Sequence, residues 1–247
     1  MIVVAEYLVF LLHAPIGAMG TVAVGERRGG FDRPGKSAVL GLIAAGLGLQ
    51  RSDEACHLAL AETFGFGLGE ITSGRLLVDY HTTQTAPRRA ERHFRTRREE
   101  LDVDDLGTLL SLREYRTDPA HIVVLWARDT ARWSLGELAE SLKQPKFVLY
   151  FGRKACPLGL PLDPRIVEAD NARAAITVYL ASRTTEQIKF LGDLQLSGSP
   201  SVLALDLDGA TDRSNELRIE HRRDAIESRR RWQFGLRSEV LLQGRKE

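Results

Sequence analysis

The residues with the clearest chemical potential lie between Gly29 and Gly48, where a glycine-rich basic loop runs into an apolar segment. Ser37 is a suitable N-cap for a helix beginning there, because its hydroxyl can accept a hydrogen bond from a first-turn amide. The start of such a helix would bring free backbone N–H groups close to Arg33 and Lys36. Backbone donors and cations at one point form an anion site, and phosphate is the expected guest.

The same loop also matches a nucleotide-binding motif. The pattern G-x-x-x-x-G-K-[ST], which holds nucleotide phosphates, is matched in full by Gly30, Gly35, Lys36 and Ser37. The motif requires a strand leading directly into the loop, whereas the predicted first strand ends near Leu12. Pro34 lacks the N–H that a phosphate cradle would use. We therefore favour contact with a nucleic-acid backbone over nucleotide hydrolysis, although the apolar run ending at Asp206 resembles a second nucleotide-binding motif.

Basic residues cluster in three further places. Arg27 and Arg28 precede the loop, and Arg153 and Lys154 follow an apolar, aromatic run. The densest cluster lies within 85–100. Surface ion pairs between its arginines and glutamates would contribute about 0–1 kcal/mol each, which is too little to explain the excess of arginine. We expect phosphate contacts there from Arg88, Arg89, Arg92, Arg95, Arg97 and Arg98, with Phe94 stacking or docking on a partner.

Composition restricts the functional class without identifying it. The chain has 247 residues, 43% of them hydrophobic and 27% charged, with a formal net charge of +1, so it can bury a sizeable core. Two cysteines, Cys56 and Cys156, are too few for a disulfide scaffold or a cysteine zinc site. The apolar start carries Glu6 and no basic lead-in, so we interpret it as a strand and expect a cytoplasmic protein without membrane contact.

The order of the predicted elements indicates an α+β fold. Strands are predicted at 3–13, 64–68, 76–83, 111–116, 122–126 and 147–151, with helices beginning near Ser37, Ser52 and Ser134. This order is that of a ferredoxin-like, RRM-type domain, assigned to 1–160, with an inserted arginine-rich thumb hairpin at about 84–112. Residues 161–247 are predicted to form a small β-rich domain with strands at 175–181, 202–206, 216–223 and 233–241.

Four stretches in this order and spacing resemble Cas family five, in particular its type I-E members in the CRISPR surveillance complex Cascade. They are 35–53, DYHTT at 79–83, REYRTDPAHIVVLW at 113–126 and PKFVLYFGRKACPL at 145–158. The arginine-rich segment 222–240 is similar to the family's ending. The resemblance implies that Tyr80, His81 and Arg113 join the RNA-contacting residues.

The resemblance also implies a role. Such a subunit is noncatalytic, holds the 5′ handle of the CRISPR RNA, caps the backbone filament next to a backbone subunit, and helps to seat the large subunit. It would contact target DNA only indirectly and would need no cofactor or metal. Whether 229–231, beside Trp232, face RNA or the large subunit is left open by the residues themselves.

Catalysis is the main alternative. Subtype I-C relatives use this scaffold as a metal-independent endoribonuclease with a Tyr, Lys and His site. Here His81, His93 and His121 are available, but no lysine and histidine are neighbours in the matching region. RNA cleavage by acid–base catalysis needs such groups to converge on one 2′-hydroxyl. We expect no processing activity, and a P-loop nucleotide-binding protein remains a further alternative.

Overall fold

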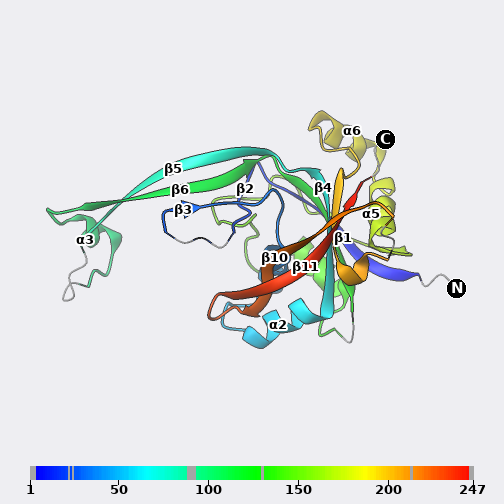
Figure 1. Cartoon of the computed structure of the whole chain (residues 1–247), viewed down its shortest axis with the longest axis horizontal. Helices are drawn as coiled ribbons and strands as arrows, with labels where there is room; N and C mark the ends of the chain where they lie inside the picture. Colours follow the sequence, from blue (N-terminus) through cyan, green and yellow to red (C-terminus); the bar gives the residue numbers. More distant parts are fainter. Residues whose placement is uncertain are drawn as a thin grey trace.

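The computed structural model describes residues 4–21, 23, 25–87, 93–128, 131–211 and 214–244. Its main element is a seven-stranded antiparallel sheet in the order β10-β11-β9-β4-β7-β1-β8 (Figure 1). The strands are β1 (Ala5–His13), β4 (Phe64–Thr72), β7 (Ala120–Ala127), β8 (Arg165–Ala169), β9 (Val202–Asp206), β10 (Glu216–Ser228) and β11 (Gln233–Gln243). The fold is therefore mixed α/β around one large antiparallel sheet.

Helices cover both faces of this sheet, which explains why β1 and β7 are apolar at almost every position. Phe10 and Leu12 point into one core with Leu60 and Leu138. The alternate residues Tyr7, Val9 and Leu11 point into the other core. The first core is covered by α1 (Lys36–Leu47), α2 (Glu54–Thr63) and α4 (Leu135–Lys143). The second is covered by α5 (Ala172–Ala181) and α6 (Thr185–Asp193).

A long two-stranded ribbon projects from this body (Figure 1). It consists of β5 (Arg75–Thr85) and β6 (Gly107–Thr117), and together with the segment between them we call it the arm. The short strands β2 (Ile16–Gly17) and β3 (Arg27–Arg28) pair with β6 near the body. The remaining short elements are α3 (Arg97–Leu101), near the far end of the arm, and the 3₁₀ turn η1 (Leu207–Gly209).

The strands beyond residue 160 do not build a sheet of their own. β8 pairs with β1 and β9 pairs with β4, so both halves of the chain share one sheet. The predicted strand at 175–181 is wrong, because this segment belongs to α5. Asn171 caps that helix, and the buried side chains follow helical spacing at Ala172, Ala175, Ile176 and Tyr179.

The predicted strand at 147–151 is also wrong. The amides of Lys146 and Phe147 donate to carbonyls at the end of α1, and Tyr150 makes a single isolated bridge with Pro157. The predictions for β9, β10, β11 and α4 are confirmed, and α4 begins with a reciprocal capping box between Ser134 and Glu137. Within the ranges given above, no helix has the length and apolar character needed to cross a bilayer.

Candidate nucleic-acid interface

The start of α1 does bind an anion, but the anion belongs to the chain itself. The N-cap is Gly35 rather than Ser37, and no side chain caps the helix at that position. The amide of Lys36 donates instead to the Asp224 carboxylate of β10 at 2.8 Å. A Cβ atom on Gly35 would lie 2.6 Å from the same carboxylate, so glycine is needed for this close approach. The expected phosphate position is therefore occupied by a side chain.

The two cations of the loop are buried and paired within the chain. Lys36 Nζ lies 3.0 Å from Asp206 Oδ2 and 2.7 Å from the Phe64 carbonyl oxygen. The Arg33 guanidinium lies 2.6 Å from Glu239 and also contacts Glu220. The prediction that Arg33, Lys36 and the helix start hold phosphate is corrected: their charges are already balanced where solvent cannot reach them.

These pairs belong to a larger buried network. Asp206 also accepts from Arg128 at 2.6 Å and from Arg237 at 2.7 Å, and Arg237 holds Asp224 with two nitrogens at 2.9 Å. Burial opposes the charge of Arg237, yet the carboxylates around it raise its pKa. Burial lowers the pKa of Lys36, with Asp206 acting in the opposite direction. The nucleotide-binding interpretation fails here because Asp224 and Asp206 occupy the positions that phosphates would need.

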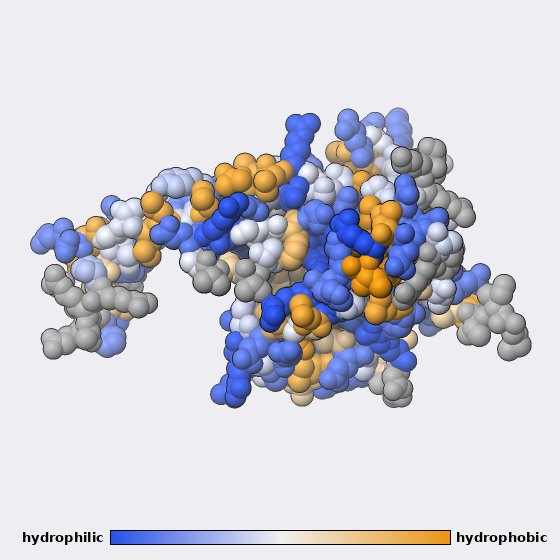
Figure 2. Space-filling view, in the orientation of Figure 1, coloured by the Kyte–Doolittle hydropathy of each residue, from blue (hydrophilic) through white to orange (hydrophobic). Residues whose placement is uncertain are grey.

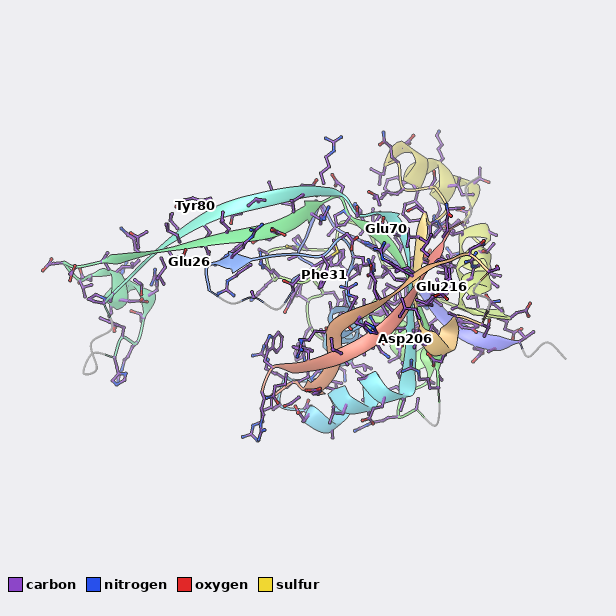
Figure 3. All side chains as sticks on the ribbon, viewed as in Figure 1. Glu26, Phe31, Glu70, Tyr80, Asp206 and Glu216 are labelled. Carbon is purple, nitrogen blue, oxygen red and sulfur yellow. The ribbon has the colours of Figure 1, made fainter. Side chains whose placement is uncertain are left out.

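The arm, by contrast, is exposed and has two distinguishable faces. Side chains alternate along a strand, and residues opposite one another in a pair share a face. Tyr80 pairs with Leu112 and His81 with Ser111, so the adjacent residues Tyr80 and His81 point to opposite faces. Figure 3 places Tyr80 on the arm and Asp206 in the body. One face, which we call the apolar face, carries exposed side chains of Leu76, Val78, Tyr80, Leu110 and Leu112, with Glu114 and Arg116 at its end near the body.

We call the opposite side the cationic face and define it by Arg28, His81, Arg113 and Tyr115. Arg28 of β3 lies next to Arg113 of β6 in parallel register, so the two guanidinium groups emerge on the same face. No ion pair in the described ranges involves either of them. The Arg153 guanidinium stacks 4.6 Å above the Tyr115 ring, and its Nη1 has no acceptor among these residues. The cationic face also carries Leu77, Leu109 and one carboxylate, Asp79, which is the register partner of Arg113.

Two other predicted residues border this face. Lys154 is exposed on the turn that carries Arg153. Arg27 is also exposed but points to the apolar side, 3.5 Å from Glu114. Glu114 additionally accepts from the amide of Gly30 at 2.8 Å and so ties the basic loop to β6. Sequence reasoning missed Glu114 and Tyr115, whose partners lie far away along the chain.

The arginine-rich insertion is described in part. Arg95, Arg97 and Arg98 are exposed near α3, whereas Arg88, Arg89 and Arg92 lie outside the described residues. Arg97 pairs with Glu100 at 2.7 Å and donates to the Gln84 carbonyl, so its charge is partly used to hold the end of the arm together. Arg95 and Arg98 remain the more available cations of this segment.

The histidines proposed for catalysis occupy different environments. His81 is partly exposed on the arm, 3.7 Å from Asp79, and His93 is exposed. His121 is fully buried in β7 against Phe151, where burial and the nearby Arg33 charge lower its pKa to about 3. His121 is therefore a core residue, and solvent or RNA cannot reach it in this structure.

A large antiparallel sheet flanked by helices, with a projecting two-stranded ribbon, defines a mixed α/β protein. Over residues 7–239 the sequence matches the family described as CRISPR-associated protein (Cas_Cas5). The chain belongs to this family.

Individual relatives agree with this assignment. The chain is 29% identical over 182 residues to CRISPR system Cascade subunit CasD of Escherichia coli (strain K12), covering 70% of this chain and 77% of the relative. It shares its fold with a chain of a "CRISPR RNA-guided surveillance complex", with a TM-score of 0.60, 18% identity, and coverage of 95% and 89% of the two chains. A "Crystal structure of Cas protein" matches with a TM-score of 0.53 and 26% identity, covering 96% and 95%.

Proposed function

We propose that this chain is a noncatalytic RNA-binding subunit of a type I-E Cascade complex that holds the 5′ handle of the CRISPR RNA. The family and the likeness to CasD support the complex. The observation that carries RNA binding is the cationic face, where Arg28 and Arg113 lie side by side on an exposed ribbon. The complex would be a cytoplasmic ribonucleoprotein that acts in antiviral defence.

The chemistry of the cationic face suits single-stranded RNA. Such RNA is bound by phosphate neutralisation, by stacking of bases on aromatic or guanidinium planes, and by hydrogen bonds to base edges and 2′-hydroxyls. Arg28, Arg113 and Lys154 supply the charge, and the Arg153 plane stacked on Tyr115 is a preformed platform. His81 adds a hydrogen-bonding ring on the same face.

The apolar face of the arm supports a protein partner. Leu76, Val78 and Tyr80 are each at least half exposed, and Figure 2 shows hydrophobic side chains along the projecting arm. Exposed apolar patches of this kind mark interaction surfaces. We assign this face to the neighbouring backbone subunit of the filament that the chain caps. The large subunit would be seated on the body, and target DNA would be met only through these partners.

The proposed role includes no RNA cleavage. Acid–base catalysis would require several groups around one 2′-hydroxyl, and His121, one of the three candidate histidines, is buried in the sheet. His81 lies on the arm instead. The role also requires neither a metal nor a cofactor.

Binding and cleavage can be tested together with a labelled CRISPR handle RNA and the full chain in EDTA. We expect intact RNA and a log–log salt slope that falls by about 1.4 in the double variant Arg28→Gln/Arg113→Gln, at roughly 0.7 per phosphate contact. Arg218→Gln/Arg223→Gln on β10 removes the same net charge from exposed positions elsewhere and should leave the slope unchanged. RNA cleavage, or equal effects of both pairs, would contradict the proposal.

A further inference from the structure

We infer that the turn between β10 and β11 is a second nucleic-acid contact, which binds the phosphate backbone of the same single strand. This inference rests on the proposed function and extends the RNA path beyond the arm. We call the site the basic turn and define it by Arg51, Arg229, Arg230, Arg231 and Trp232. Arg51 comes from the segment before α2, far from the others in sequence, and sequence reasoning did not connect it with them.

Stacking organises the basic turn. The guanidinium carbon of Arg51 lies 4.2 Å from the Trp232 ring centre, and that of Arg229 lies 4.5 Å from it. Phe234 supports the indole edge-on, with 5.4 Å between ring centres. Trp232 is 54% exposed and has a left-handed backbone with φ of 59°, a conformation that bulky residues rarely adopt. The planar cations are thus held in place by the ring and leave N–H edges free for an acceptor.

Among the described residues, the guanidinium groups of the basic turn outnumber the carboxylates that reach it. Four arginines meet there, and among the described residues none of them takes part in an ion pair. Glu54 reaches the turn, where its carboxylate accepts from the backbone amide of Arg230 at 2.9 Å and its charge partly offsets that of Arg229. Burial and the neighbouring Arg51 charge lower the pKa of Arg229, whose Nε has no acceptor in the described ranges. Such crowding of like charges is relieved when an external polyanion binds.

The basic turn lies near the segment that carries Arg153. Tyr150, three residues before Arg153 in the same turn, is close enough to Arg229 to act on its pKa. Arg153 in turn stacks on Tyr115 of the cationic face. Cations stacked on aromatic rings are therefore found both on the cationic face and at the tip of β10 and β11. Proteins that hold single-stranded nucleic acids combine the same two features.

These observations favour nucleic acid over an acidic protein as the partner. An acidic protein surface would satisfy the charge of the basic turn but would not explain why guanidinium groups stack on aromatic rings both there and on the cationic face. A single strand uses both, because it carries one phosphate for each nucleotide and a base that can stack.

The test uses the full chain and a labelled oligouridine RNA of about 20 nucleotides, long enough to span more than one contact. The double variant Arg230→Gln/Arg231→Gln changes exposed turn residues, and Arg218→Gln/Arg223→Gln on the same hairpin is the matched control. Raising the salt from about 50 to about 200 mM should weaken wild-type binding about sevenfold more than binding by the turn variant, since two phosphate contacts are lost. The control should behave like the wild type.

Other outcomes separate the possible failures. If the wild type binds no RNA, the proposed function fails together with this inference. If the arm variant Arg28→Gln/Arg113→Gln lowers the slope and the turn variant does not, only the basic-turn inference is overturned. It is also overturned if the turn variant keeps the RNA slope but loses another Cascade subunit on co-purification, because the partner would then be a protein.

Discussion

Replacing Lys36 by methionine separates a structural role for this lysine from a role in RNA binding. Methionine has a similar length and an apolar end, so it can occupy the same buried space. The substitution removes the contacts of Lys36 Nζ with Asp206 and with the Phe64 carbonyl. Asp206 still accepts from Arg128, Arg237 and the amide of Phe66.

The expected loss in the free energy of unfolding depends on how many donors Asp206 keeps. Because Asp206 keeps three donors in Lys36→Met, we expect a loss of about 1.5–3 kcal/mol in the free energy of unfolding, in the range of a single hydrogen bond to a charged group. Asp206→Asn removes the common anion of Lys36, Arg128 and Arg237. Breaking a buried pair in this way typically costs about 3–5 kcal/mol, so Asp206→Asn should be the more damaging variant.

Urea denaturation of Lys36→Met and Asp206→Asn measures which variant loses more free energy of unfolding. The salt dependence of RNA binding is then measured on the same Lys36→Met sample. We expect Lys36→Met to keep the wild-type slope, because its side chain is only 5% exposed. The reasoning is refuted if Lys36→Met unfolds like the wild type while its salt slope falls by about 0.7, the value for one lost phosphate contact.

Two further predictions concern the core. His121 is uncharged when folded, with a pKa of about 3 against about 6.5 when unfolded, so the unfolded state gains a proton first as pH falls. Its contribution to stability should therefore drop by about 2 kcal/mol from pH 7 to 5, and an equal drop in His121→Leu would exclude it as the cause. Gly65→Ala places a Cβ 2.0 Å from the Trp126 ring and should cost about 1–3 kcal/mol or more in urea. Gly41→Ala in α1 should instead stabilise by about 0.5–1 kcal/mol, because its Cβ would meet only the Arg229 side chain, at 3.7 Å. A reversed order of the two variants would contradict tight packing of Gly65 against Trp126.

Local patterns predicted much of the fold. The capping signal at Ser134 and the runs at 202–206 and 233–241 correspond to α4, β9 and β11. The alternation along β5 already implies that Tyr80 and His81 point to opposite faces. The strand predicted at 175–181 is wrong because the β-branched residues of this segment favour strands. Its apolar positions nevertheless have helical spacing, and it belongs to α5.

No residue near the start of α1 indicates that the predicted phosphate site is occupied by a carboxylate of the chain itself. The partners of Lys36 lie 170 and 188 residues away, at Asp206 and Asp224, and Glu239 lies 206 residues from Arg33. A basic loop before a helix predicts an anion site, and that part is right. The sequence near the loop does not reveal that a distant carboxylate fills the site, because only the pairing of β9, β10 and β11 brings these residues together.

The central claim is that the two faces of the arm have different partners, RNA on the cationic face and protein on the apolar face. Photocrosslinking in the assembled complex tests it directly, with p-benzoylphenylalanine placed at His81 in one sample and at Tyr80 in another. We predict that the His81 position crosslinks to the guide RNA and the Tyr80 position to a neighbouring protein subunit. Crosslinks from His81 to protein alone, or from Tyr80 to RNA alone, would contradict the account.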